Sequence, residues 1–319
     1  MKIMVTGGAG FIGSHVVDKY IENGHEVIVV DNLSSGKIEN VNKNARFYKI
    51  DIRSEELVNL IQRESPEIIN HHAAQISVPD SVRDPIYDAD INIKGLLNIL
   101  EAAKSRIEKF IFISSGGAIY GDATEYPTSE NYSPKPLSPY AISKLTSEHY
   151  LHYYKHQYGM EFTVLRYSNI YGPRQIPHGE AGVVAIFMEN VVNNKVSNLY
   201  HFPGEEEGMI RDYCFVGDVA EANLLALQKG NGEAINIGTG KEVRTLRLYL
   251  DLIEAYADIT GKDCNHVKDP IRAQARPGDI PRSCLRIQKA KEILGWEPRT
   301  DLKKGLMTTW EWRLKGVEA

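Results

Sequence analysis

The chain has 319 residues, enough for about two domains of ordinary size or for one large α/β unit with an added lobe. Hydrophobic residues make up 42% and charged residues 25% of the sequence, which is typical of a globular protein and excludes a disordered chain, a collagen-like repeat and a coiled coil. The 37 Lys and Arg residues against 42 Asp and Glu residues give a net charge of -5, so no basic excess is present to hold nucleic acid or an anionic membrane nonspecifically.

The N-terminus and the cysteines bear on where the protein works. Residues 1–6 lead directly into a run of glycines, which leaves no room for the apolar stretch of a signal peptide. The three cysteines are far apart and form no CxxC pair, which excludes a disulfide framework and disfavours a thiolate metal site. We therefore expect a cytoplasmic protein with no metal, no membrane contact and no nucleic-acid partner.

The first 170 residues alternate short apolar runs with longer amphipathic ones. Strands are predicted for six segments rich in Val, Ile and Phe: 2–6, 26–31, 47–50, 68–72, 110–114 and 162–166. Helices are predicted between most of them, at 11–23, 54–63, 91–104 and 139–158. This alternation predicts the α/β class, with a Rossmann-like, doubly wound parallel sheet that carries helices on both faces.

Beyond residue 170 the alternation weakens, and Gly and Pro separate shorter elements. We expect residues 1–170 to form the sheet domain and residues 171–319 to form mainly a smaller C-terminal α/β substrate-binding lobe. A segment around 211–240 should return to the sheet domain. Ligands of open α/β sheets bind beyond the carboxyl ends of the strands, so the second lobe should close over that edge and carry substrate specificity.

A glycine-rich loop follows the first predicted strand and precedes the first predicted helix. Gly7, Gly10 and Gly13 give the spacing GxxGxxG, which permits a tight turn, close approach of a pyrophosphate to the backbone, and close packing of helix on strand. The next strand ends in Asp31, a position where a carboxylate binds ribose hydroxyls and repels a 2′-phosphate, and no Arg occurs in residues 32–36. The loop therefore predicts NAD, rather than NADP, as cofactor.

Tyr140 and Lys144 are four residues apart in a predicted helix, so they share one face. A tyrosine with a pKa near 10 is a poor base at neutral pH, but a nearby ammonium favours its phenolate. The YxxxK pattern alone is frequent on exposed helices; beside a dinucleotide-binding loop it indicates an acid/base tyrosine.

Several further short motifs follow one another along the chain. They are Asp31-Asn32-Leu33, Asp51-Ile52, His72-Ala73-Ala74, Arg166-Tyr167-Ser168-Asn169, Arg211-Asp212-Tyr213, Arg276-Pro277-Gly278-Asp279 and Leu294-Gly295-Trp296-Glu297-Pro298. In this order and spacing, together with the glycine loop and the YxxxK pair, the chain resembles the extended short-chain dehydrogenase/reductase family. Within that family it is most similar to the UDP-glucose (UDP-galactose) 4-epimerases, over essentially its whole length.

The resemblance implies an NAD site. By similarity, Asp51 and Ile52 hold the adenine, and Tyr167 lies beside the nicotinamide. The cofactor-binding residues implied are Gly7, Gly10, Phe11, Ile12, Gly13, Asp31, Asn32, Ser35, Gly36, Asp51, Ile52, His72, Ala73, Ala74, Gln75, Asn92, Tyr140, Lys144 and Tyr167.

A UDP-sugar substrate is implied in the same way. Arg211 and Arg276 would neutralise its diphosphate, because a guanidinium binds phosphate oxygens in a bidentate fork. Asp279 would meet the uridine ribose. The substrate-binding residues implied are Asn169, Val183, Arg211, Tyr213, Arg276 and Asp279.

The activity implied is inversion of the C4 hydroxyl of a UDP-hexose, UDP-glucose or UDP-galactose, through a transient 4-keto intermediate on tightly held NAD. Tyr140 would act as acid and base, while Lys144 would orient the nicotinamide ribose and lower the pKa of Tyr140. The family commonly dimerises through the helix that contains Tyr140 and the one that contains Asn92, so we expect a homodimer.

One position departs from the family pattern. The family usually places Ser or Thr four residues before the tyrosine of its VYG-like turn, where the hydroxyl binds the reacting oxygen. Here Tyr120 is that tyrosine, and Gly116 occupies the slot. Either Ser115 serves as the third catalytic residue through a shifted loop, or a water or a backbone N–H replaces it.

Two other functions remain open at this point. The substrate could be a UDP-N-acetylhexosamine or a UDP-uronate, and the small Ser283, where some relatives carry a bulky aromatic residue, suggests room for an N-acetyl group. The chain could instead be a noncatalytic NAD-binding regulatory module. Intact Tyr140 and Lys144 argue against that alternative, and Gly116 favours it.

Overall fold

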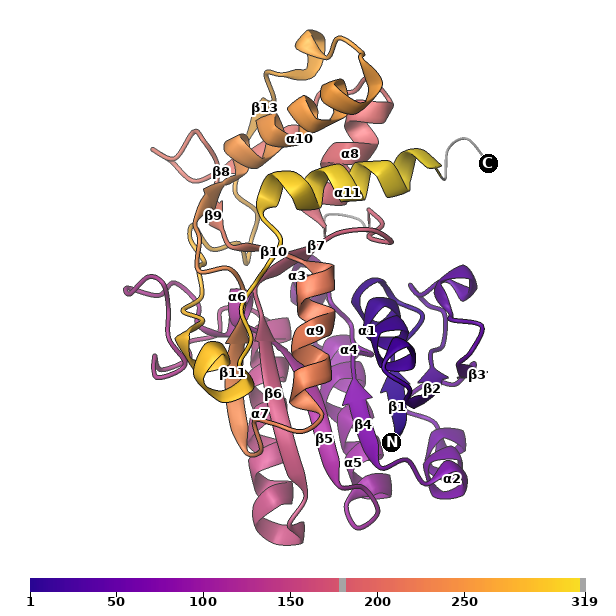
Figure 1. Ribbon diagram of the computed structural model, residues 1–319. Helices are drawn as coiled ribbons and strands as arrows, with labels where there is room; N and C mark the ends of the chain where they lie inside the picture. The colour runs from indigo at the N-terminus through magenta and orange to yellow at the C-terminus, as the bar shows by residue number, and fades with distance from the viewer. Residues whose placement is uncertain (178–181, 316–319) are drawn as a thin grey trace.

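The computed structural model describes residues 1–177 and 182–315. A seven-stranded parallel sheet lies at the centre of its larger domain. The strand order is β11-β6-β5-β4-β1-β2-β3 (Figure 1). The strands are β1 (Lys2–Thr6), β2 (Glu26–Val30), β3 (Arg46–Tyr48), β4 (Ile68–His71), β5 (Lys109–Ser115), β6 (Glu161–Tyr167) and β11 (Glu233–Ile237). The chain therefore reaches the edge strand β11 only after it has passed through part of the second lobe.

Both faces of the sheet are covered by helices, which explains why its strands are almost continuously apolar. One face packs on α1 (Phe11–Glu22), α9 (Val216–Ala226) and the short helix η4 (Ala290–Leu294). The other face packs on α2 (Glu55–Glu64), α5 (Gly95–Ala103) and α7 (Pro139–Tyr158). Successive residues of β1 point to opposite faces, so Ile3 and Val5 belong to the first core and Met4 to the second.

Shorter elements connect the sheet to its surroundings. They are η1 (Ile38–Asn40), α3 (Val78–Arg83), α4 (Pro85–Ala89), the π-helical turn η2 (Asp90–Lys94), which runs directly into α5, and α6 (Gly116–Ile119). The N-cap of α3 is Ser77 and that of α4 is Asp84, and both side chains accept backbone hydrogen bonds from the first turn.

The second lobe lies above the carboxyl ends of the sheet strands in Figure 1 and has a hydrophobic core of its own. Its helices are α8 (Val183–Val192), α10 (Thr245–Thr260), η3 (Asn265–Val267) and α11 (Leu302–Lys315). Three two-stranded sheets complete it: β7 (Asn169–Tyr171) with β10 (Tyr213–Phe215), β8 (Asn198–His201) with β13 (Ile271–Gln274), and β9 (Ile210–Arg211) with β12 (Val243–Arg244).

The predicted elements of the first 170 residues are all present, with ends displaced by a few residues. The segment predicted as a strand at 47–50 forms β3 at 46–48 instead, and the helix predicted at 91–104 begins as a π-helical turn at 90. The fold-class prediction of a doubly wound parallel sheet with helices on both faces is confirmed. Helices α3 and α4 were not predicted, because each is too short to show a helical hydrophobic period.

Trp296 provides a test of the core that joins the C-terminal segment to the sheet domain. Its side chain is buried and its indole Nε1 donates to the Asp218 carbonyl at 2.8 Å. Trp296→Ala should lower the free energy of unfolding by about 3–5 kcal/mol, because it leaves a large cavity and removes that hydrogen bond. Trp312→Ala, at a half-exposed position on α11, should cost less than about 1 kcal/mol. Equal losses in denaturant titrations of the two variants would contradict this account.

Candidate active site

The glycine loop brings the N-terminus of α1 onto the end of β1 with no space for side chains. A methyl group on Gly13 would lie 2.2 Å from the Gly7 carbonyl oxygen, and one on Gly7, whose φ is +71°, would lie 2.6 Å from the Ala73 backbone nitrogen. No side chain caps α1, whose N-cap residue is Gly10, so its first-turn N–H groups are open to a ligand. Such a helix start is an anion-binding position.

Asp31 lies at the end of β2 beside this loop. Its carboxylate accepts hydrogen bonds from the backbone N–H of Ala9, at 3.0 Å, and of Leu33, at 2.8 Å. Burial raises the pKa of this carboxyl group, while the two hydrogen bonds oppose that effect. A methyl group on Gly36 would lie 2.9 Å from both carboxylate oxygens of Asp31. Glycine at position 36 therefore leaves room for the Asp31 carboxylate.

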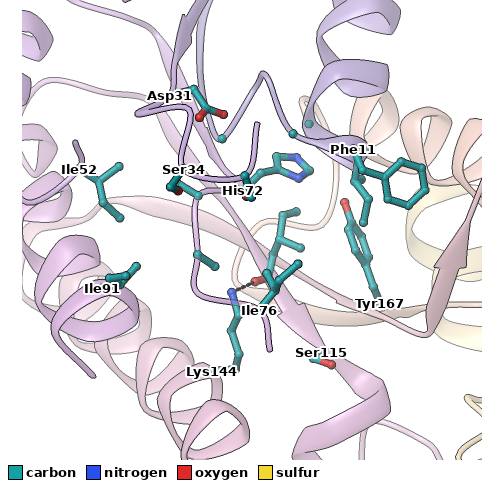
Figure 2. A pocket seen from close by; sticks show the side chains of 18 of the residues that line it. Phe11, Asp31, Ser34, Ile52, His72, Ile76, Ile91, Ser115, Lys144 and Tyr167 are labelled. Atoms are coloured by element: carbon teal, nitrogen blue, oxygen red, sulfur yellow. Dashed lines mark hydrogen bonds between the residues drawn. The ribbon is translucent and has the colours of Figure 1, made fainter. Parts of the chain in front are cut away.

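A cavity runs along the carboxyl edge of the sheet from Asp31 to Tyr140 (Figure 2). It is lined by 16 of the 19 residues predicted for the cofactor: Gly7, Gly10, Phe11, Ile12, Gly13, Asp31, Asn32, Ser35, Asp51, Ile52, His72, Ala73, Ala74, Tyr140, Lys144 and Tyr167. Among the described residues that line it, Lys144 is the one Lys or Arg, and it lies far from Asp31 in Figure 2. The Asp31 end therefore offers a 2′-phosphate no positive partner.

The three predicted cofactor residues that do not line the cavity are Gly36, Gln75 and Asn92. Asn92 is buried and holds the loop after β4: its amide donates to the Gln75 carbonyl, and its Oδ1 accepts from the Gln75 N–H, both at 2.9 Å. Asn92, predicted as a cofactor-binding residue, thus contacts the loop at Gln75 and is not among the residues that line the cavity.

Tyr140 and Lys144 lie on one face of α7, as predicted; the Lys144 side chain is buried and that of Tyr140 is half-buried. Lys144 Nζ donates to the Ile113 carbonyl at 2.9 Å, drawn as the dashed line in Figure 2, and lies 5.8 Å from the centre of the Tyr140 ring. Burial lowers the pKa of Lys144 to about 8. Burial also raises the pKa of Tyr140 to about 12, and the Ser115 hydroxyl acts in the opposite direction. Desolvation of the phenol is therefore the largest influence on the pKa of Tyr140.

Ser115 ends β5 and lines both cavities together with Tyr140, whose pKa the Ser115 hydroxyl lowers. A methyl group on Gly116 would lie 2.6 Å from Leu285 Cδ1 and 3.2 Å from the Arg166 carbonyl oxygen. A Ser or Thr side chain at residue 116 would therefore require the Leu285 side chain to shift. Ser115 lines both cavities beside Tyr140, whereas Gly116 lines neither.

Two histidines end β4 and face different surroundings. His71 is buried and pairs with Thr6 Oγ1 at 2.6 Å, whereas His72 lines the cavity, its ring 6.4 Å from that of Tyr167. Burial lowers the pKa of His72 to about 3, so it is neutral at physiological pH. Tyr167 accepts a hydrogen bond from Asn223 at 2.6 Å, which fixes its ring at the cavity wall.

A second cavity lies between the sheet edge and the second lobe. It is lined by all six residues predicted for the substrate, Asn169, Val183, Arg211, Tyr213, Arg276 and Asp279. Arg211 donates to the backbone carbonyls of Ile210 and Ile280, and burial lowers its pKa. Arg276 pairs with Asp279 at 3.0 Å and lies 4.7 Å over the Tyr200 ring. Two guanidinium groups thus converge on one cavity, where an anion would offset their mutual repulsion.

The two cavities share the residues around Tyr140. Ile76, Ser115, Tyr140, Ser168 and Asn169 line both. Ile76 and Ser168 were not predicted as site residues. Ser168 is part of a motif that pointed to it, but Ile76 is an apolar residue in a loop, and the sequence carries no signal that would single it out.

The family model described as "NAD dependent epimerase/dehydratase family" matches residues 3–238. This chain belongs to that family. The crystal structure of UDP-glucose 4-epimerase from Thermotoga maritima with UDP-glucose is 49% identical, covers 99% of this chain and 100% of its own, and has a TM-score of 0.92.

Two further solved structures are similar over nearly the whole length of both chains. UDP-glucose 4-epimerase from Thermus thermophilus in complex with NAD is 45% identical, with 98% of each chain covered and a TM-score of 0.88. UDP-N-acetylglucosamine 4-epimerase from Methanobrevibacter ruminantium in complex with UDP-N-acetylmuramic acid is 33% identical, covering 99% of this chain and 98% of its own, with a TM-score of 0.88.

These similarities confirm the predicted family, the prediction of an epimerase-type enzyme and NAD as its cofactor. No helix within residues 1–177 and 182–315 is long and apolar enough to cross a membrane. Within the same residues, no three His, Cys, Asp or Glu side chains are grouped so that they could hold a metal ion.

Proposed function

We propose that this protein inverts the C4 hydroxyl of a UDP-hexose, interconverting UDP-glucose and UDP-galactose. The observation that carries the proposal is the position of Tyr140, which lines both cavities. A side chain able to give and take a proton thus lies where a bound dinucleotide and a bound nucleotide sugar would meet. The 49% identity to the Thermotoga maritima enzyme supports the same conclusion.

The residues of the first cavity fit NAD. The open N-terminus of α1 and the absence of side chains at Gly7 and Gly13 leave the backbone bare for a pyrophosphate, and the Asp31 carboxylate suits ribose hydroxyls. Bound there, NAD would supply an acceptor for the C4 hydride and return it to the opposite face of the sugar.

The protein's own residues would manage the proton and the charge. Tyr140 takes the proton from the sugar O4 and returns it, with the Ser115 hydroxyl as its hydrogen-bond partner. Lys144 supplies a positive charge near the phenol, which favours the phenolate that the proton transfer requires. Arg211 and Arg276 hold the diphosphate, so the sugar can turn while the nucleotide stays bound.

A second candidate substrate is a UDP-N-acetylhexosamine, because Gly117 on the wall of the second cavity leaves space for a methyl group there. A methyl group on Gly117 would lie 3.6 Å from Asn169 Oδ1, 3.9 Å from Ser115 Oγ and 4.0 Å from Ser283 Oγ, which are ordinary van der Waals distances. The Methanobrevibacter ruminantium relative is named for such a substrate. A UDP-uronate is less well supported. Among the described residues that line the second cavity, only Arg211 and Arg276 are cationic, and both are assigned to the diphosphate, so no further cation faces the carboxylate of the sugar.

A panel of UDP-sugars tests the proposed reaction. Purified protein incubated with UDP-glucose, UDP-galactose, UDP-N-acetylglucosamine or UDP-glucuronate, without added NAD, should invert C4 fastest in the first two, as followed by proton NMR. Faster turnover of UDP-N-acetylglucosamine would move the assignment to the second candidate. NAD binding without inversion of any sugar would identify a noncatalytic binding module.

Tyr140→Phe tests the acid/base role. Loss of the hydroxyl should lower kcat by about 10²–10⁴-fold, because the proton on O4 then has no positioned acceptor. NAD binding, measured by calorimetry, should stay close to that of the wild type, since the ring remains. An unchanged kcat would refute the mechanism.

Ser115→Ala tests the third member of the site. It should lower kcat roughly tenfold with little change in KM, the effect of one hydrogen bond lost from Tyr140 in the transition state. Ser115→Thr keeps the hydroxyl and should retain most of the turnover. Wild-type rates in the alanine variant would eliminate Ser115 from the mechanism.

A further inference from the structure

A buried carboxylate that no motif singled out lies beneath the candidate active site. Asp88, on the short helix α4, is fully buried. It accepts hydrogen bonds from Gln75 Nε2 and Asn92 Nδ2, both at 3.0 Å, and from Ser143 Oγ at 2.6 Å. All three donors are neutral, so within the described part of the chain no ion pair compensates this carboxylate.

Two separate parts of the candidate site meet at Asp88. Gln75 belongs to the loop whose neighbours Ala73, Ala74 and Ile76 line the first cavity. Ser143 immediately precedes Lys144 on α7, and the charge of Asp88 acts on both Lys144 and Tyr140. A carboxylate in this position fixes the loop against α7 and also imposes a field on the two reacting side chains.

The other charged groups around Lys144 differ from Asp88. Glu148, one turn further along α7, forms a buried ion pair with Arg166, with contacts of 2.6 and 3.1 Å, so much of its charge is offset. His71 at the end of β4 and His72 after it are kept neutral, because burial lowers the pKa of each. Among the described groups that act on Lys144, Asp88 is the uncompensated negative charge.

We propose that Asp88 is a positioning residue that acts through Lys144: its buried carboxylate keeps the lysine ammonium beside Tyr140 charged. The structural reason is desolvation: Lys144 is buried, and a buried ammonium needs a nearby negative charge to remain protonated. In the proposed reaction, on which this part of the inference rests, loss of the ammonium would leave the Tyr140 phenolate without its positive neighbour.

Asp88→Asn separates charge from shape. The asparagine oxygen can accept from Gln75 and Asn92, and its amide can donate to Ser143, because a hydroxyl serves as donor or acceptor. The hydrogen-bonded frame is therefore kept while the charge is lost. Ser143→Ala makes the opposite change, since it removes one hydrogen bond and leaves the charge.

Carbon-13 NMR of the protein labelled at lysine Cε measures the titration of Lys144 directly. The Lys144 signal is assigned as the one that is lost in Lys144→Arg. In Asp88→Asn the titration midpoint of Lys144 should move to lower pH by about one unit, because the charged form has lost its attraction. Ser143→Ala should leave the midpoint in place, as should Asp80→Asn, which removes an exposed carboxylate paired with Arg83 on the preceding helix. An unmoved midpoint in Asp88→Asn would overturn the proposal.

Two further measurements complete the test. The pH profile of kcat in Asp88→Asn should move to lower pH as a whole, because removal of the negative charge lowers the pKa of both Lys144 and Tyr140; a purely structural role would lower kcat without moving the profile. The lysine titration needs no substrate, so it stands even if the proposed reaction fails. Should Asp88→Asn not fold, a carboxyl carbon-13 signal of wild-type Asp88 that is protonated at pH 7 would equally refute the proposal.

Discussion

The constraint on which the site depends is the parallel register of the central strands. Thr6 of β1 pairs with Val30 of β2 and His71 of β4, so these strands end at one level. The residue that follows or closes each strand therefore enters the same edge: the glycine loop after β1, Asp31 after β2, His72 after β4, and Ser115 at the end of β5. Because both faces of the sheet are buried, a slip of register would expose apolar side chains, and the level of the strand ends is strongly specified.

Close packing at that edge then sets the chemistry. The helix α1 approaches β1 so closely that Gly13 cannot carry a side chain, and this leaves the backbone as the binding surface. At the other end of the cavity, Tyr140 and Lys144 lie close together, and desolvation moves their pKa values apart, to about 12 for Tyr140 and about 8 for Lys144. A polar network of Glu148, Arg166 and Ser114 lies below them and supports the strand ends with a buried ion pair.

The second lobe contributes what the sheet edge lacks, a concentrated positive charge. A protein of net charge -5 has no general attraction for a dianion. Arg211 and Arg276 come from segments 65 positions apart, yet they face one cavity because β9 and the loop after β13 meet there. Attraction for a diphosphate is thus local, and it depends on how the lobe folds over the sheet.

The sequence by itself determined the local features of this protein. The glycine spacing, Asp31 at a strand end and the YxxxK pair are short-range patterns, and each lies in the structure in or directly beside the element predicted for it. The tertiary structure decided which side chains share a space. It placed Leu285 against Gly116, paired Asn92 with Gln75, and brought Ile76 and Asp88 to Tyr140 and Lys144. Burial and contacts between distant segments govern these outcomes, and neither leaves a periodic or spaced signal along the chain.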